Sequence, residues 1–77
     1  MNEVFFGELK VGEPFKFDYR SQFINIKTAD KHPMHHAAGL AKYDRASLLR
    51  VGFQPIEAHE REWIVFNDDL VIKQEKE

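Results

Sequence analysis

Apolar and charged residues alternate near the start of the chain, where we predict the first strand. Phe15, Phe17 and Tyr19 alternate with charged residues, which is the two-residue period of a strand with one buried face. A second strand is predicted over residues 22–28, where Phe and Ile favour β-structure. The short Arg20-Ser21 connection between the two favours an antiparallel hairpin.

A helical spacing replaces this alternation in the middle of the chain. Apolar residues follow one stripe with a period of 3.6 residues, at Ala37, Leu40, Ala41, Leu48 and Val51. The stripe predicts a helix over about 34–50, with Pro33 in its first turn and Gly52 at its left-handed C-terminal cap. The alternative interpretation is that Met34 to Tyr43 forms another strand.

The last third of the chain predicts a second hairpin. Residues 62–66 and 70–73 have the composition of strands, and the polar Asn67-Asp68-Asp69 turn joins them. Residues 74–77 form a charged tail with no apolar anchor, so we expect it to fray. The predicted class is α+β, with one domain over 1–73: a small antiparallel sheet or partly open β-barrel with one inserted helix.

The predicted core combines apolar residues of both hairpins with two residues of the helix. A chain of 77 residues buries roughly 60–65% of the surface that its unfolded form exposes, so large side chains matter. Each aromatic residue buries on the order of 150–250 Å². The predicted core residues are Phe15, Phe17, Ile24, Ile26, Trp63, Val65, Leu70 and Ile72, with Ala41 and Leu48 from the helix.

The composition narrows the class of protein. The chain has no cysteine, which excludes a disulfide framework and a thiolate metal site and favours a reducing compartment. The longest apolar run, Trp63 to Phe66, is far shorter than the roughly 18 residues that a membrane helix needs. We therefore expect a cytoplasmic protein that does not associate with membranes.

Charge is distributed unevenly along the chain. The net charge is -2, which argues against broad binding to a phosphate backbone, because that mode requires a basic surface. Residues 32–50 nevertheless carry Lys42, Arg45 and Arg50 against Asp44 alone, and residues 51–77 are acidic. A locally basic middle is therefore followed by an acidic end.

No stretch of the sequence carries a catalytic signature. His59-Glu60-Arg61-Glu62-Trp63 begins like the zinc-protease helix motif, but Trp63 stands where that mechanism needs a second histidine. The serines and threonine stand in no nucleophile motif, and the glycines match no phosphate-binding spacing. We therefore expect no enzymatic activity and no cofactor.

A histidine cluster is the remaining candidate for metal chemistry. His32, His35 and His36 lie close together, and Asp30 could add an oxygen ligand of the kind that divalent metals accept. The alternative is a polar, exposed entrance to the helix, because short histidine clusters are compositional cues. The prediction assigns no metal and keeps the three histidines as candidates.

The predicted helix offers a candidate binding surface opposite its apolar stripe. Arg and Tyr are enriched at protein interfaces, where they anchor contacts, and a basic patch suits an acidic partner. The alternative is a solvated helix on which Leu49 closes the core from the side. The predicted partner-binding residues are Lys42, Tyr43, Arg45, Leu49 and Arg50.

The opening of the chain resembles short β-barrel accessory proteins of phage and prophage genomes. The resemblance is carried by the pattern F-x-x-L-x-x-G-x-x-F-x-F from Phe6 to Phe17, by Ile26-Lys27-Thr28 and by Val65-Phe66-Asn67-Asp68 before Val71. It covers about half the chain, and residues 30–60 are an insertion relative to it. The resemblance implies an accessory or host-interacting role.

Three functions follow as hypotheses. The first is a non-enzymatic protein-interaction module, a phage-type accessory protein that binds and modulates a host protein in the host cytoplasm. The second is a small nucleic-acid-binding β-barrel that uses Lys16, Arg20 and Lys27 on the wet face of the first hairpin together with the helix cations. The third is a metal-binding protein that uses the histidine cluster. Homo-oligomerisation is compatible with all three.

Overall fold

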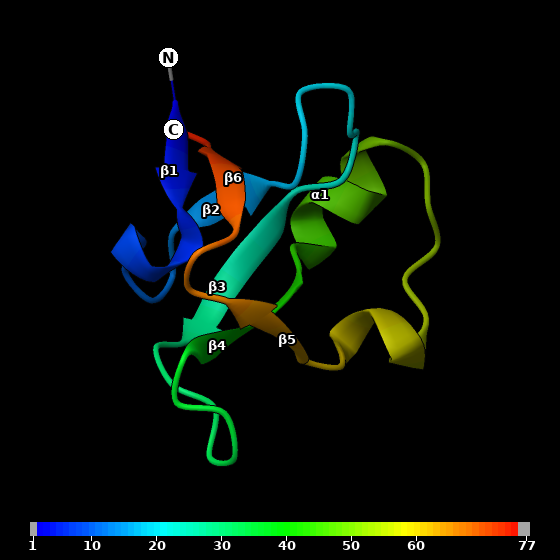
Figure 1. Cartoon of the computed structure of the whole chain (residues 1–77). Coiled ribbons are helices and arrows are strands. Elements are labelled where there is room, and N and C mark those ends of the chain that lie inside the picture. Colours follow the sequence, from blue (N-terminus) through cyan, green and yellow to red (C-terminus); the bar gives the residue numbers. More distant parts are fainter. Residues whose placement is uncertain (1, 76–77) are drawn as a thin grey trace.

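One antiparallel sheet makes up most of the molecule (Figure 1). The computed structural model describes residues 2–75. Within them the sheet has six strands in the order β1-β6-β2-β3-β4-β5. The strands are β1 (Glu3–Phe5), β2 (Pro14–Lys16), β3 (Asn25–Ala29), β4 (Ala38–Tyr43), β5 (Trp63–Phe66) and β6 (Leu70–Lys73). The helical elements are the 3-10 turns η1 (Phe6–Glu8) and η2 (Glu57–Glu60) and the helix α1 (Arg45–Arg50).

The sheet curls but does not close, because β1 and β5 are its two edges. The first 3-10 turn, η1, lies beside the turn that connects β5 to β6. Phe6 N donates to Asp69 O at 2.8 Å, and Gly7 N donates to Asn67 O at 3.0 Å. This is a small, sheet-rich domain. With one short helix and isolated 3-10 turns it is not clearly an α+β fold, and the predicted class is corrected accordingly.

The predicted helix over 34–50 is wrong for most of its length. Residues 38–43 are strand β4, and helix α1 begins only at Arg45, after Asp44 accepts a capping hydrogen bond from Ala46 N at 3.1 Å. Residues 38–43 form a strand and not a helix because β4 pairs with β3 on one side and with β5 on the other. Both neighbours supply hydrogen-bond partners for its backbone groups. The alternative of a strand over 34–43 is right for its last six residues. The predicted cap is confirmed, since Gly52 has a φ of 87°.

The two predicted hairpins have different outcomes. β2 and β3 pair antiparallel as expected, although β2 ends at Lys16 and residues 17–24 connect the strands in place of a two-residue turn. β5 and β6 form close to the predicted positions but do not pair with each other. β6 lies between β1 and β2, and β5 pairs with β4. Strand β1, which pairs with β6, was not predicted. The turn at residues 67–69 does not by itself show that β6 pairs with β1 and β2 and not with β5.

The core lies on the concave face of the curled sheet. The buried cluster consists of Phe6, Leu9, Phe15, Ala41, Val65 and Val71, with Val4 and Trp63 packed against it. The predictions for Phe15, Ala41, Leu48, Val65 and Ile72 are confirmed. Phe17 and Leu70 are exposed, so they are corrections, and Ile24, Ile26 and Trp63 are half-buried.

Strand β3 places its polar residues inward. The register pairs Phe15 with Asn25 and Lys27 with Ala41. Because directly opposite residues in an antiparallel pair share a face, Asn25 and Lys27 join the core face, and Ile26 points to the other side. The prediction placed Ile24 and Ile26 in the core because they are apolar. The register instead directs Asn25 and Lys27 to the core face, since a shift of one residue exchanges the two faces of a strand.

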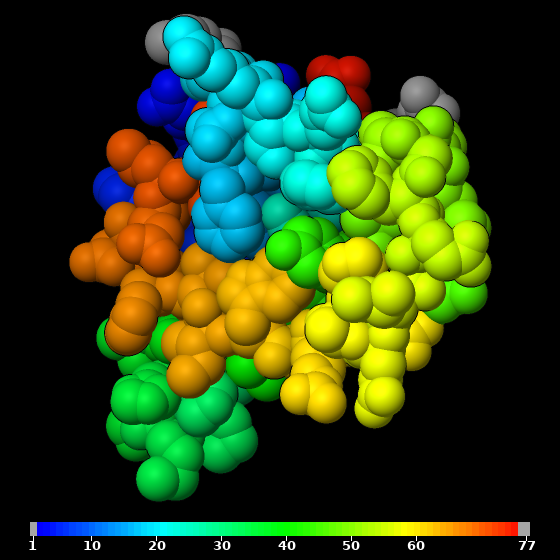
Figure 2. Space-filling view, turned by 90° about the vertical axis from the view of Figure 1, so that its right-hand side faces the viewer, coloured from blue at the N-terminus to red at the C-terminus, as the bar shows by residue number. Residues whose placement is uncertain are grey.

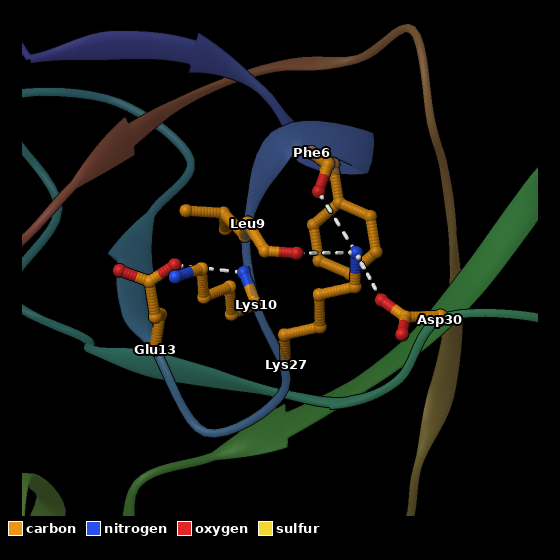
Figure 3. Close-up of polar contacts among 6 residues, drawn as sticks. All are labelled: Phe6, Leu9, Lys10, Glu13, Lys27 and Asp30. Atoms are coloured by element: carbon orange, nitrogen blue, oxygen red, sulfur yellow. Dashed lines mark hydrogen bonds and ion pairs between the residues drawn. The ribbon is translucent and has the colours of Figure 1, made fainter.

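Lys27 is a buried cation with a complete set of partners (Figure 3). Its side chain is 1% exposed, and Nζ donates to Leu9 O at 2.8 Å and to Phe6 O at 3.2 Å. Nζ also lies 3.1 Å from Asp30 Oδ1 and 4.8 Å from the centroid of the Phe6 ring. The ammonium therefore fastens β3 to η1 and the segment that follows it.

Glu13 connects the loop before β2 to strand β6. Its Oε1 accepts from Lys10 N at 2.7 Å, and its Oε2 lies 3.1 Å from Lys73 Nζ. The hydrogen bond from the Lys10 backbone, followed by the one from the Lys73 ammonium, lowers the pKa of the Glu13 carboxyl below its usual value. The charged form is therefore favoured by folding.

The stability difference between the wild type and Glu13→Gln should shrink in acid. A carboxyl whose pKa is lowered on folding stabilises the folded state above its unfolded pKa, and this contribution is lost as the pH falls through the folded pKa. The difference in free energy of unfolding should be full near neutral pH and should fade below about pH 4.3, the usual value for glutamate. Urea titrations across this range measure it, and a difference that does not depend on pH would contradict the expectation.

Candidate functional site

The end of β4 borders a groove with a volume of about 590 Å³. Strand β4, helix α1 and the turn η2 supply most of its walls, and we call it the β4–α1 groove. Asp44 is the single residue between β4 and α1, and its carboxylate caps the helix by accepting from Ala46 N. The lining residues are Ile26, Lys42, Tyr43, Asp44, Arg45, Leu48, Pro55, His59 and Glu60.

Five aromatic rings pack together beside this groove. Tyr43 stands at their centre, with ring centroids 4.7 Å from Trp63, 5.3 Å from His59 and 5.8 Å from Phe23. Phe53 extends the group, 5.1 Å from Phe23. We call Phe23, Tyr43, Phe53, His59 and Trp63 the aromatic cluster. Phe53 is exposed and the other four rings are half-buried, so the cluster is part of the surface.

Segments that are far apart in the sequence build this face (Figure 2). The segment after β2 (light blue), the start of β5 (gold) and the loop from α1 to η2 (yellow-green and yellow) meet around a small green area of the middle of the chain. The members of the aromatic cluster come from these segments. Such a surface, with partly exposed Tyr and Trp, has the composition of a protein-binding site.

The charges around the groove are partly neutralised. Arg45 Nη1 lies 2.7 Å from Glu60 Oε1, which ties α1 to η2. The Asp44 carboxylate accepts the capping hydrogen bond from Ala46 N, and His59 Nδ1 accepts from Ile56 N at 3.3 Å. Lys42 is exposed and makes no ion pair with another described residue. The charges that line the groove therefore balance, with Lys42 and Arg45 against Asp44 and Glu60, and Lys42 is the cation that has no ion-pair partner among the described residues.

The structure brings together some of the predicted partner-binding residues. Lys42, Tyr43 and Arg45 all line the β4–α1 groove. Arg50 lines a second hollow of about 450 Å³ with Ile24 and Gln74, among others, and Leu49 is exposed on α1. The expectation that all five share one helical face is wrong, because Lys42 and Tyr43 belong to β4, where successive side chains point to opposite faces.

Four members of the aromatic cluster were not predicted as binding residues. Phe23, Phe53, His59 and Trp63 come from three separate parts of the chain, and no local spacing links them. In the sequence, His59 stood out only as part of an incomplete motif, and Trp63 was predicted as a core residue. The single sequence signal was the high aromatic content of 13%, which does not say where rings meet.

The histidine candidates lie in the connection between β3 and β4. The rings of His32 and His35 are 5.1 Å apart, and His32 Nδ1 accepts from Met34 N at 3.0 Å. Among residues 2–75, no group of three or more His, Asp or Glu side chains is arranged to hold a metal ion. The connection is therefore a hairpin loop with two neighbouring imidazoles.

Comparisons with protein-family models, curated proteins and solved structures gave no match. In the part of the chain that the structure describes, no helix is long and apolar enough to cross a membrane. Of the predicted tail, Gln74 donates from its backbone to Pro14 O at 3.0 Å, and residues 76–77 lie outside the described residues.

Proposed function

We propose that this protein is a non-enzymatic interaction module that binds an acidic segment of another protein at the β4–α1 groove. In line with the phage and prophage proteins that it resembles, it acts as an accessory protein that modulates a host protein in the cytoplasm. The observation that carries the proposal is the partly exposed aromatic cluster beside the groove. Tyr43 and His59 belong to both features.

The residue types at this surface favour a polypeptide as the ligand. Tyr, Trp and Arg supply most of the binding energy at protein interfaces, because they combine large buried area with hydrogen-bonding groups. Lys42 adds a positive charge without an ion-pair partner among the described residues, and it would attract a carboxylate of the partner. Exposed Leu49 and Arg50 extend the candidate surface along α1.

Nucleic-acid binding is the second candidate, and the exposed rings favour it, because aromatic side chains can stack on bases. The structure removes one of its predicted cations, however, because Lys27 is buried and bonded inside the fold. Of the other two cations predicted on that hairpin, Arg20 is exposed and Lys16 is half-buried. With a net charge of -2, the overall field opposes a phosphate backbone.

We expect Lys42→Glu to weaken partner binding roughly tenfold, because it replaces an attraction with a repulsion at the rim of the groove. Lys31→Glu is the matched control, since Lys31 is also exposed but lies in the β3–β4 connection. Partners are captured from a host lysate with the tagged wild type and identified by mass spectrometry. Their affinities for the wild type and both variants are then measured by calorimetry.

The outcomes separate the candidates. Loss of binding with Lys42→Glu and not with Lys31→Glu supports the groove, whereas equal loss with both indicates nonspecific attraction. Unchanged binding by both places the interface elsewhere. A second pair, Phe53→Ser and Val11→Ser, repeats the comparison for exposed apolar side chains. Titration of single-stranded oligonucleotides at low salt tests the rival function, and affinity that falls steeply with salt would favour it.

A further inference from the structure

The strand β5 has one free backbone edge. Asn67 N donates to Ala37 O at 2.8 Å, and the register continues through Gly39 opposite Val65 and Ala41 opposite Trp63. In an antiparallel ladder, hydrogen-bonded and non-hydrogen-bonded pairs alternate. Ile64 and Phe66 therefore direct their backbone groups away from β4, and β5 has no second neighbouring strand among the described residues. Phe66 O accepts from Asp69 N at 3.1 Å, so the groups that the edge offers are the two N–H groups and the Ile64 carbonyl.

Apart from its short length of four residues, this edge lacks the usual protection against strand pairing. Natural edge strands are blunted by charge, proline, bulges or short length. The other edge strand, β1, has three residues and carries Glu3. In contrast, β5 carries no charge and no proline, and its register with β4 has no shift. The Ile64 and Phe66 side chains are 40% and 48% exposed.

We propose that β5 pairs antiparallel with β5 of a second copy of this chain, which joins two sheets across a two-fold axis. Free N–H and C=O groups at a strand edge are recognised by another extended backbone, and a two-fold axis lets one surface serve both copies. The arrangement places Ile64 of each copy opposite Phe66 of the other. Both residues offer exposed apolar side chains on the same face, so the cross-strand pairs also bury apolar area.

The charges that flank β5 favour the antiparallel over the parallel arrangement. Arg61 and Glu62 lie just before the strand, and Asp68 and Asp69 follow it. With Ile64 opposite Phe66 of the other copy, Arg61 of each copy lies opposite Asp69 of the other, which is attractive, and Glu62 lies opposite Asp68, which is repulsive. Glu62, the acidic residue next to the start of β5, accepts a hydrogen bond from Thr28 of its own β3. A parallel pairing would instead bring like charges together at both ends.

The test compares Ile64→Lys with Leu70→Lys in the full chain. Leu70 is 57% exposed but lies on β6, which has strand neighbours on both sides. Sedimentation equilibrium over a wide concentration range should show a monomer–dimer equilibrium for the wild type. The dissociation constant should rise roughly tenfold or more with Ile64→Lys, because charges then face an apolar strand, and should stay within about twofold with Leu70→Lys. Circular dichroism verifies that both variants keep the fold.

Hydrogen exchange identifies the surface independently of the variants. The Ile64 and Phe66 N–H groups should become more protected as the protein concentration rises, whereas the Val65 N–H, which faces β4, should be protected throughout. A wild type that stays monomeric at all concentrations overturns the proposal. A dimer that survives Ile64→Lys, or that leaves the Ile64 and Phe66 amides unprotected, overturns it as well.

Discussion

Replacing Lys27 should destabilise the fold more than replacing its charged partner. Lys27→Met removes the donor that Leu9 O uses, and a buried carbonyl without a donor costs about 1–3 kcal/mol. Lys27→Ala also leaves a cavity, so we expect a total loss of about 3–5 kcal/mol. Asp30→Asn should cost less, about 1–3 kcal/mol, because the amide oxygen can still accept from Nζ although the buried ammonium loses its anionic partner.

Urea unfolding of the three variants measures this order. A domain of this size has a total stability of only about 4–12 kcal/mol, so Lys27→Ala should unfold at much lower denaturant concentrations or fail to fold. Lys27→Met tests the physical reason. Buried ion pairs can sometimes be replaced by apolar residues without loss, so a Lys27→Met variant as stable as the wild type would show that the fold does not need the hydrogen bonds to Phe6 and Leu9.

Gly39→Ala should be nearly as damaging, although it adds only one methyl group. A Cβ at position 39 would lie 2.5 Å from Ala29 O and 2.9 Å from Phe6 Cε2. The first of these atoms is backbone on the neighbouring strand β3, so the clash cannot be relieved by rotating a side chain. We expect a loss of about 3 kcal/mol or more, at the upper end of the cost of overpacking a core.

Gly12→Ala is the matched control for this substitution. Its Cβ would meet no atom within 4 Å, but Gly12 has a φ of 94°. The same methyl group therefore tests backbone conformation without a clash, at an expected cost of about 1–2 kcal/mol. Thermal and urea unfolding of both variants provide the comparison. If Gly39→Ala costs no more than Gly12→Ala, the close approach of β3 and Phe6 to β4 does not limit the packing of this sheet.

The middle of the chain was assigned to a helix because Ala37, Leu40 and Ala41 fit a helical stripe. The same short apolar run fits a doubly covered strand equally well, because periodicity cannot separate the two. The decisive facts are the neighbours β3 and β5 and the closeness of Phe6 to Gly39. None of these is local in sequence. By contrast, the C-terminal cap at Gly52 could be predicted, because a helix end is encoded within a few residues.

The residues of the candidate site were also predicted only in part. Lys42, Tyr43 and Arg45 were found from the sequence as a locally basic, aromatic segment, and they do line one groove. The aromatic cluster was not predicted, because its rings come from different elements. Phe23 and Trp63 contact Tyr43, and Phe53 contacts Phe23. A pattern along the chain can indicate which residues are suited to binding, but only the fold brings distant rings into contact.

By itself, the sequence determined that this is a small, sheet-rich chain without cysteine, with strands near residues 15, 25, 64 and 71 and a polar turn at 67–69. Those features follow from alternation, composition and turn chemistry, which act over a few residues. The tertiary structure alone decided that β6 lies between β1 and β2, that Lys27 points inward and that β5 keeps a free edge. Strand partners and register depend on contacts between distant segments, and a shift of one residue exchanges the faces of a strand.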